Sequence, residues 1–217
     1  MRSQRRNGTL MHNIAKYVYE IGQLKRVKRS GWWVAGIDNP ESVAEHSFRT
    51  ALLGYILASL EGADPQKTAM ICLFHDMGEA RINDLHRVAK RYIDVGNREE
   101  AAFEEQAERL PQPLAENVVA FMHEYERRSS FEGQLAHDAD LLECLIQARE
   151  YQAQGPIHFK EDVLRVKRSR CRSVILSASF GSLAGRRSFA ALRMTKRDGL
   201  FFEMYWAQAV ASSRGSQ

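Results

Sequence analysis

The stretch Ile71-Cys-Leu-Phe-His-Asp-Met-Gly-Glu79 places an imidazole and a carboxylate side by side at the end of an apolar run. Two further candidate ligands stand elsewhere in the chain, namely His46 in Ser42-Val-Ala-Glu-His46 and Asp140 in His137-Asp-Ala-Asp140. Two imidazoles and two carboxylates suit a divalent first-row metal and leave coordination positions open for water and substrate. The sequence therefore predicts a metal site made of four side chains: His46, His75, Asp76 and Asp140.

These residues also have simpler explanations when each is taken alone. At the C-terminus of a helix an imidazolium is favourable, and an aspartate can close the following turn. His46 would fit equally well as an ordinary residue at a capped helix start. Asp138 follows His137 and so repeats the dipeptide, and spacing does not separate Asp138 from Asp140. The ordered set of separated motifs, rather than any single residue, favours the metal site.

Apolar residues recur at helical spacing along most of the chain, and strand patterns are almost absent, so we expect an all-α fold. The helix over 98–110 is expected to be charged and mostly solvated. The predicted helices cover residues 14–24, 42–60, 64–78, 98–110, 114–125 and 131–153.

Two of these helices have recognisable starts. Ser42 and Glu45 have the spacing of a capping box, and Asp64 is a suitable N-cap because a proline follows it at the first helical position. A helix that continued from there to residue 78 would place His75 and Glu79 on one face, since they are four residues apart.

The composition is that of a soluble globular protein, with 44% hydrophobic and 27% charged residues among 217. No uncharged apolar stretch reaches about 18 residues, so we expect no membrane span. Residues 1–12 are basic without the apolar core of a signal peptide, which predicts a disordered lead-in. The three cysteines, Cys72, Cys144 and Cys171, form no paired metal motif. Cys72 and Cys144 lie in apolar helical patterns and are expected to be reduced core residues, which makes a cytoplasmic location the expectation.

Charge divides the chain into two unlike parts. Residues 163–217 carry 11 Lys and Arg against 2 Asp and Glu, a net charge of +9, while the whole chain carries +4, which leaves −5 for residues 1–162. We expect a domain over 13–165 and an atypical basic tail over 166–217. The Ser-, Arg- and Ala-rich stretch 174–195 resembles translated dispersed repeat DNA of some bacterial genomes. Nucleic acid is not an expected partner except through phosphate contacts of this tail.

The ordered pattern of His46, His75-Asp76 and Asp140 resembles that of the HD-domain metal-dependent phosphohydrolases. More narrowly, four segments are similar to the branch that contains the 5′-deoxynucleotidases: residues 24–32, 40–46, 75–84 and 138–151. The resemblance covers about 14–155. It implies an HD-domain helical bundle, a small nucleotide as substrate and a homodimer.

The resemblance also implies residue roles. The four ligands would hold one divalent ion, which would be Mn, Co, Mg, Fe or Zn. Glu79 matches the carboxylate that handles protons on the attacking water, and Asp84 matches an acidic residue of the substrate pocket. Arg29 and Trp32 match residues that hold the phosphate and the sugar. Arg29-Ser-Gly-Trp32 departs from the adjacent Arg-Trp pair of some members, and Asn83-Asp84-Leu-His86 departs from the usual Gly-Asp with a nearby proline.

The implied reaction is removal of the 5′-phosphate from (deoxy)nucleoside monophosphates by a metal-activated water. Two alternatives stay open. One is an HD hydrolase of another phosphorylated nucleotide, such as guanosine tetraphosphate or a cyclic nucleotide. The other is a degenerate HD domain that serves as a binding module, with the basic tail contacting nucleic acid.

Overall fold

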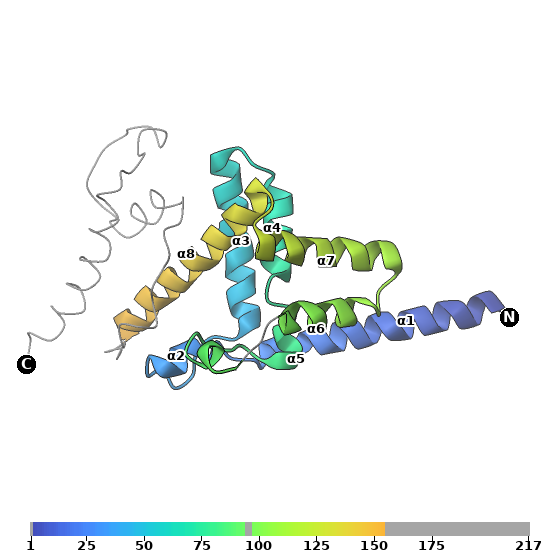
Figure 1. The fold of residues 1–217 in the computed structure, drawn as a ribbon, viewed down its shortest axis with the longest axis horizontal. Coiled ribbons are helices and arrows are strands. Elements are labelled where there is room, and N and C mark those ends of the chain that lie inside the picture. The colour runs from blue at the N-terminus through green and yellow to red at the C-terminus, as the bar shows by residue number, and fades with distance from the viewer. Residues whose placement is uncertain (1, 94–96, 155–217) are drawn as a thin grey trace, which may run out of the picture. The chain divides into compact units, whose positions relative to one another are not determined.

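The computed structural model describes residues 2–93 and 97–154, and this part of the chain is helical with no strands, which confirms the all-α class (Figure 1). The predicted tail over 166–217 and Cys171 lie outside the described residues. The helices are α1 (Arg2–Ile21), α2 (Gly31–Val34), α3 (Val43–Glu61), α4 (Pro65–Phe74), α5 (Glu79–Ile82), α6 (Arg98–Ala107), α7 (Gln112–Arg127) and α8 (Phe131–Gln154), with 3₁₀ turns at Gly22–Lys25 and Ala89–Arg91.

Both predicted helix starts are confirmed. The Glu45 backbone N–H donates to Ser42 Oγ at 3.2 Å, and the Ser42 N–H donates to Glu45 Oε2 at 2.6 Å, which completes the capping box of α3. At α4, Asp64 Oδ1 accepts from the Lys67 N–H at 3.0 Å, and Pro65 occupies the first turn. These caps satisfy backbone donors that the first turn of a helix leaves without partners, so both helix starts are fixed by local sequence.

The centre of the fold is the packing of α3 against α4 and α8. Gly54 makes the α3–α4 approach possible, because a Cβ atom there would lie 2.5 Å from Cys72 Sγ. Leu57 and Ile71 are fully buried in the same region. Since α3 carries His46, this close packing fixes the position of that imidazole relative to α4 and α8.

A second apolar cluster joins α1, α6 and α7 through Tyr17, Phe103 and Met122. The expectation that residues 98–110 form a mostly solvated helix was wrong on one side, because Phe103 and Gln106 are fully buried. Glu104 and Glu105 are exposed on α6, and the high content of glutamate concealed a short apolar contact face.

Two further expectations need correction. The lead-in over 1–12 was expected to be disordered, whereas α1 begins at Arg2 and continues the amphipathic pattern of residues 14–21. The helix expected to reach residue 78 ends at Phe74. Backbone bonds with three-residue spacing, such as Glu79 N to Asp76 O at 3.2 Å, make a turn there. His75 and Glu79 therefore do not share one helix face.

No helix in the described ranges combines the length and the apolar character that crossing a membrane requires.

Candidate metal centre

The first imidazole of the site comes from α3, where His46 is fully buried. Its Nδ1 lies 2.5 Å from Glu143 Oε2, and because a carboxylate accepts, we assign a hydrogen to Nδ1. Nε2 lies 3.1 Å from Asp140 Oδ1 and 3.8 Å from Asp76 Oδ2. Nε2 is therefore the nitrogen that His46 offers to a cation.

The second imidazole follows α4. His75 Nδ1 donates to the Cys72 carbonyl at 2.6 Å, which again leaves Nε2 as the free nitrogen. This Nε2 is buried and lies 3.1 Å from Asp76 Oδ2, an ion-pair distance at which the geometry is not that of a hydrogen bond. A buried polar atom without a well-aligned hydrogen bond is costly unless something binds it. His75 thus fits a metal ion better than it fits an empty core position.

The two imidazoles and their carboxylates form one cluster. The ring centroids of His46 and His75 are 5.4 Å apart, and one ligand atom from each of His46, His75 and Asp76 falls within 4.8 Å of the others. Asp140 is the α8 residue that reaches the cluster. Asp138 stands two positions earlier, which is about 200° around the helix. Helix geometry thus separates two residues that sequence spacing left equivalent.

Without a metal, hydrogen bonds and charge interactions between the imidazoles, the carboxylates and Arg29 stabilise the cluster. Burial alone would lower the pKa of His46, but hydrogen bonds to Asp140 and Glu143 raise this pKa to about 9. Burial would raise the pKa values of Asp76 and Asp140, but the charges of the neighbouring imidazoles and of Arg29 hold both well below the usual range. In this form imidazolium protons balance the carboxylates, and a divalent cation would have to replace them.

Arg29 is the guanidinium of the site. Its Nη1 donates to Asp76 Oδ2 at 3.1 Å and lies 3.9 Å from Asp84 Oδ1, and its Nη2 lies 3.8 Å from Asp140 Oδ1. Nη2 also donates to Cys144 Sγ at 3.2 Å. One guanidinium faces three carboxylates here, so Arg29 alone does not balance their charge, and either imidazolium protons or a metal cation must supply the rest.

Asp84 takes part in hydrogen bonds that join two loops. One carboxylate oxygen accepts from the Ser30 backbone N–H, and Ser30 Oγ accepts from the His86 N–H at 3.0 Å. The segment 28–31 is therefore hydrogen-bonded to the segment 84–86. Both departures from the usual family pattern fall in these two segments, so they lie next to each other in the fold.

Glu79 lies at the start of α5 and is only 3% exposed. Its Oε2 is buried with no hydrogen-bond partner among the described residues. Burial raises the pKa of Glu79 well above its usual value, and the charges of Asp76 and Asp84 raise it further. A carboxyl group with one unused oxygen beside the metal cluster is suited to carrying a proton.

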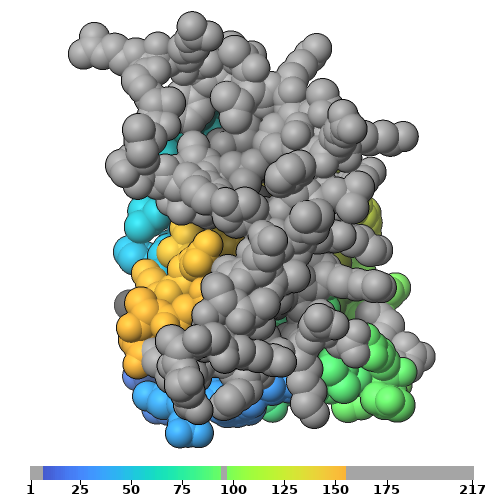
Figure 2. All heavy atoms as spheres, turned by 90° about the vertical axis from the view of Figure 1, so that its left-hand side faces the viewer, coloured from blue at the N-terminus to red at the C-terminus, as the bar shows by residue number. Residues whose placement is uncertain are grey.

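Trp32 is buried and packs against other side chains. Its Nε1 donates to Glu41 Oε1 at 3.0 Å, and its ring meets Tyr151 edge-on at a centroid distance of 5.2 Å. Ala35 and Ala148 complete the cluster, and Figure 2 shows the end of α8 (orange) beside the segment that contains α2 (blue). The structure therefore brings Arg29 to the metal cluster and turns Trp32 towards α8, and contact of Trp32 with a sugar stays a prediction.

Three side chains behind the ligands were not among the residues singled out from the sequence. Glu143 holds His46, and Arg49 in turn donates to Glu143 Oε1 from Nε at 2.9 Å and from Nη2 at 2.6 Å. Tyr125 donates from its hydroxyl to Asp140 Oδ2 at 2.8 Å. Glu143 and Arg49 each stand three residues after a ligand on the same helix, which is a usable sequence signal. Tyr125 comes from another helix and gives no such signal.

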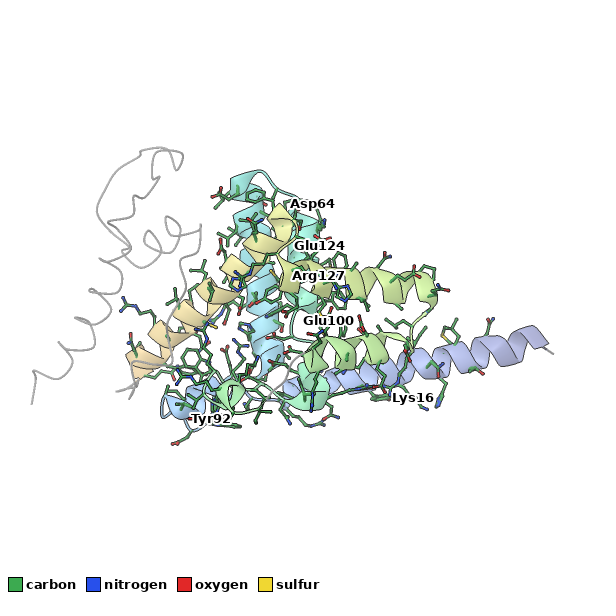
Figure 3. The ribbon with its side chains drawn as sticks, viewed as in Figure 1. Lys16, Asp64, Tyr92, Glu100, Glu124 and Arg127 are labelled. Atoms are coloured by element: carbon green, nitrogen blue, oxygen red, sulfur yellow. The ribbon has the colours of Figure 1, made fainter. Side chains whose placement is uncertain are left out.

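A separate polar cluster joins α6 and α7 at the surface. His123 Nε2 lies 2.8 Å from Glu100 Oε1 and 3.1 Å from Glu104 Oε1. Arg127 also pairs with Glu100, and Figure 3 labels these two residues. Half of the Glu104 side chain is exposed. Arg127 already balances part of the acidic charge, so this cluster is an ion-pair network between two helices.

Comparison with known proteins gives one consistent family. Residues 21–177 match the family described as HD domain. The 5′-deoxynucleotidase HDDC2 of Bos taurus is 30% identical over 149 residues, which are 67% of this chain and 71% of the relative. The protein of the same name from Danio rerio is 31% identical over 145 residues, 65% of this chain and 71% of the relative.

Solved structures agree. A conserved hypothetical protein from Pyrococcus furiosus superposes with a TM-score of 0.55 at 36% identity, covering 65% of this chain and 80% of that one. A predicted metal-dependent phosphohydrolase from Magnetospirillum magnetotacticum gives 0.54 at 26% identity, covering 64% and 72%.

Proposed function

The chain belongs to the HD domain family, and from this premise we propose that it is a metal-dependent phosphohydrolase that removes the 5′-phosphate of nucleoside monophosphates, with a preference for deoxynucleotides. The observation that carries the proposal is the meeting of two imidazoles and two carboxylates in one buried cluster. His46 Nε2 lies 3.8 Å from Asp76 Oδ2 and 3.1 Å from Asp140 Oδ1, and the buried His75 Nε2 lies 3.1 Å from Asp76 Oδ2. The names of the vertebrate relatives support the substrate class.

One divalent ion would be held by four side chains: His46, His75, Asp76 and Asp140. When bound, the ion supplies Lewis-acid chemistry, because it lowers the pKa of water and neutralises phosphate charge. Imidazole and carboxylate ligands suit Mn, Co, Fe and Zn, while Mg would rely mainly on the carboxylates.

Phosphate binding, proton transfer and positioning would be carried out by side chains of the protein. Arg29 presents a planar guanidinium with several N–H donors, a geometry that matches phosphate oxygens. It lies at the edge of the carboxylate cluster, where a phosphate oxygen would replace part of its contact with Asp76. Glu79 would act at Oε2, the oxygen that has no partner in the structure, either as the base that takes a proton from the attacking water or as the acid that gives a proton to the leaving oxygen. Asp84 keeps the Arg29 segment in place through the Ser30 N–H.

A homodimer and a cytoplasmic location are further parts of the proposal. The outer face of α3 exposes large apolar side chains at helical spacing, which is unusual for a monomer surface. They are Phe48, Leu52, Tyr55, Ile56 and Leu60. A second copy of the chain would bury this α3 face. The cytoplasmic location rests on the unpaired cysteines Cys72 and Cys144.

The test is phosphate release from a panel of deoxy- and ribonucleoside 5′-monophosphates with Mn²⁺, Co²⁺ or Mg²⁺ and an EDTA control. Guanosine tetraphosphate and cyclic nucleotides belong in the same panel, because the metal cluster alone does not distinguish these substrates. We expect metal-dependent release that is fastest with deoxynucleotides.

The matched variants are His75→Gln and His123→Gln, since both replace a histidine but only the first belongs to the metal cluster. His75→Gln is expected to lose activity and metal binding, whereas His123→Gln keeps both. Absence of phosphate release from every compound in a metal-loaded protein would refute the hydrolase and favour the binding module.

A further inference from the structure

We propose that Tyr125 is a positioning residue of the metal site, which holds Asp140 as a one-oxygen ligand and supports the ring of His75. The proposal rests on the proposed function, because it assumes that the cluster of His46, His75, Asp76 and Asp140 binds a divalent ion. It concerns a different element of the fold, α7, which contributes none of those four ligands.

The hydroxyl contact decides which oxygen of Asp140 is available. Tyr125 Oη donates to Asp140 Oδ2 at 2.8 Å, while the other oxygen, Oδ1, lies 3.1 Å from His46 Nε2 and 3.8 Å from Arg29 Nη2. A phenol is a neutral donor at physiological pH, so it occupies Oδ2 without competing as a base. The carboxylate is thereby oriented with Oδ1 towards the histidine cluster and Oδ2 towards α7.

The ring contact acts on a second ligand. The Tyr125 ring centroid is 4.8 Å from that of His75 and 5.7 Å from that of His137, so the phenol ring lies against both imidazoles. His75 stands just after the end of α4, where backbone hydrogen bonds of three-residue spacing replace those of the α-helix. A large ring packed against it limits the orientations of the imidazole. One side chain therefore restricts two ligands that come from α4 and α8.

Such outer contacts have measurable effects on metal sites. Removing a hydrogen-bond partner of a ligand commonly weakens metal binding by about 10- to 100-fold. Tyr125→Phe deletes only the hydroxyl and keeps the ring against His75, so it isolates the effect on Asp140. We expect Co²⁺ affinity to fall by about 10-fold in this variant.

Tyr17 offers a matched control. Tyr17 is a buried tyrosine, but its hydroxyl has no hydrogen-bond partner among the described residues and it lies in the apolar cluster of α1 and α6. Tyr17→Phe removes the same atom from the same kind of residue. We expect it to leave Co²⁺ affinity and the visible spectrum of the Co²⁺ protein unchanged.

The experiment measures Co²⁺ binding by calorimetry and the visible absorption of the loaded full-length protein, with thermal unfolding to show that each variant folds. A changed Co²⁺ spectrum and weaker binding in Tyr125→Phe alone would support the proposal. Wild-type affinity and spectrum in Tyr125→Phe, or equal losses in both tyrosine variants, would overturn it.

A double-mutant cycle with Asp140→Asn tests the route of the effect. If Tyr125 acts through Asp140, the double variant binds Co²⁺ no more weakly than Asp140→Asn alone, while additive losses would contradict that route. These readouts need no substrate. Wild-type protein that binds Co²⁺ but hydrolyses none of the nucleotides would refute the proposed function and leave the Tyr125 comparison decisive.

Discussion

Glu143 Oε2 lies 2.5 Å from His46 Nδ1, and both side chains are fully buried. The other oxygen of the same carboxylate accepts two hydrogen bonds from Arg49. The imidazole of His46 in α3 is thus oriented by the carboxylate of Glu143 in α8. Arg49, also in α3, holds that carboxylate in place. Metal-ligating histidines commonly have such a partner, which fixes the ring and increases its basicity.

Glu143→Gln tests that relationship. We expect metal affinity to fall by about 10- to 100-fold, because an amide orients His46 more weakly and no longer balances Arg49. Titration with Mn²⁺ or Co²⁺ measures the change. Glu150→Gln is the control, because Glu150 also pairs with Arg49 but is half exposed and distant from His46. Equal losses in the two variants would show that Arg49 pairing alone matters.

Glu79→Gln separates catalysis from metal binding. We expect turnover to fall at least about 100-fold, since an amide can neither take nor give the proton, while Co²⁺ affinity changes little. Glu105→Gln, on the exposed side of α6, is the comparison and should keep full activity. Full turnover in Glu79→Gln would remove Glu79 from the reaction.

Glu41 makes stability depend on pH. Burial and, to a smaller extent, the negative charge of Glu143 together raise the pKa of Glu41 to about 7. A carboxyl group whose pKa is raised on folding stabilises the protein while it is protonated in the folded state. This contribution is full below about pH 4.5 and is lost as the pH rises through 7, with an upper limit of about 3 kcal/mol.

Glu41→Gln should therefore stabilise the metal-free protein more at pH 8 than at pH 5, because glutamine accepts from Trp32 Nε1 at any pH. Thermal unfolding in EDTA at the two pH values gives the comparison. The same change of Tm at both values would mean that Glu41 does not titrate in this range.

Gly78 has little space around it. A Cβ atom there would lie 2.5 Å from the backbone oxygen of Glu99, where the residues before α5 meet the start of α6. Gly78→Ala should destabilise the protein by about 1–3 kcal/mol, measured by urea unfolding. Gly8→Ala, in α1 with nothing within 4 Å, should instead stabilise by up to about 1 kcal/mol. A neutral Gly78→Ala would show that α6 moves easily.

The exposed apolar side chains on the outer face of α3 lead us to predict a dimer. Replacing Phe48 and Leu52 by glutamate places two charges on the exposed apolar stripe without entering the core. If two copies meet there, light scattering after size exclusion should show a dimer for the wild type and a monomer for the double variant. A wild-type monomer, or a dimer that survives both charges, would contradict the proposed face.

Sequence reasoning succeeded where the signal was local. The capping box at Ser42 and the cap at Asp64 depend on neighbouring residues only, and the structure contains both. The end of α4 was placed too late because nothing in the apolar pattern marks the turn that follows Phe74. The burial of Gln106 was also missed, since its environment is built by other helices.

The same distinction applies to the metal cluster. His46, His75 and Asp76 were proposed as ligands from motif order, Asp140 was preferred to Asp138 on the family resemblance, and the fold brings the four side chains together. Asp138 and Asp140 were equivalent by spacing and differ only in the side of α8 that they occupy.

Arg29 and Trp32 are three residues apart, yet they face different surroundings: the carboxylate cluster on one side and the apolar end of α8 on the other. Ser30 and Gly31 stand between them and separate the two side chains. A change on the Trp32 side, such as a smaller residue in place of Tyr151, would alter the packing at the end of α8 and leave the carboxylates around Arg29 in place. Apolar packing and charge balance can therefore be varied one at a time in this short segment.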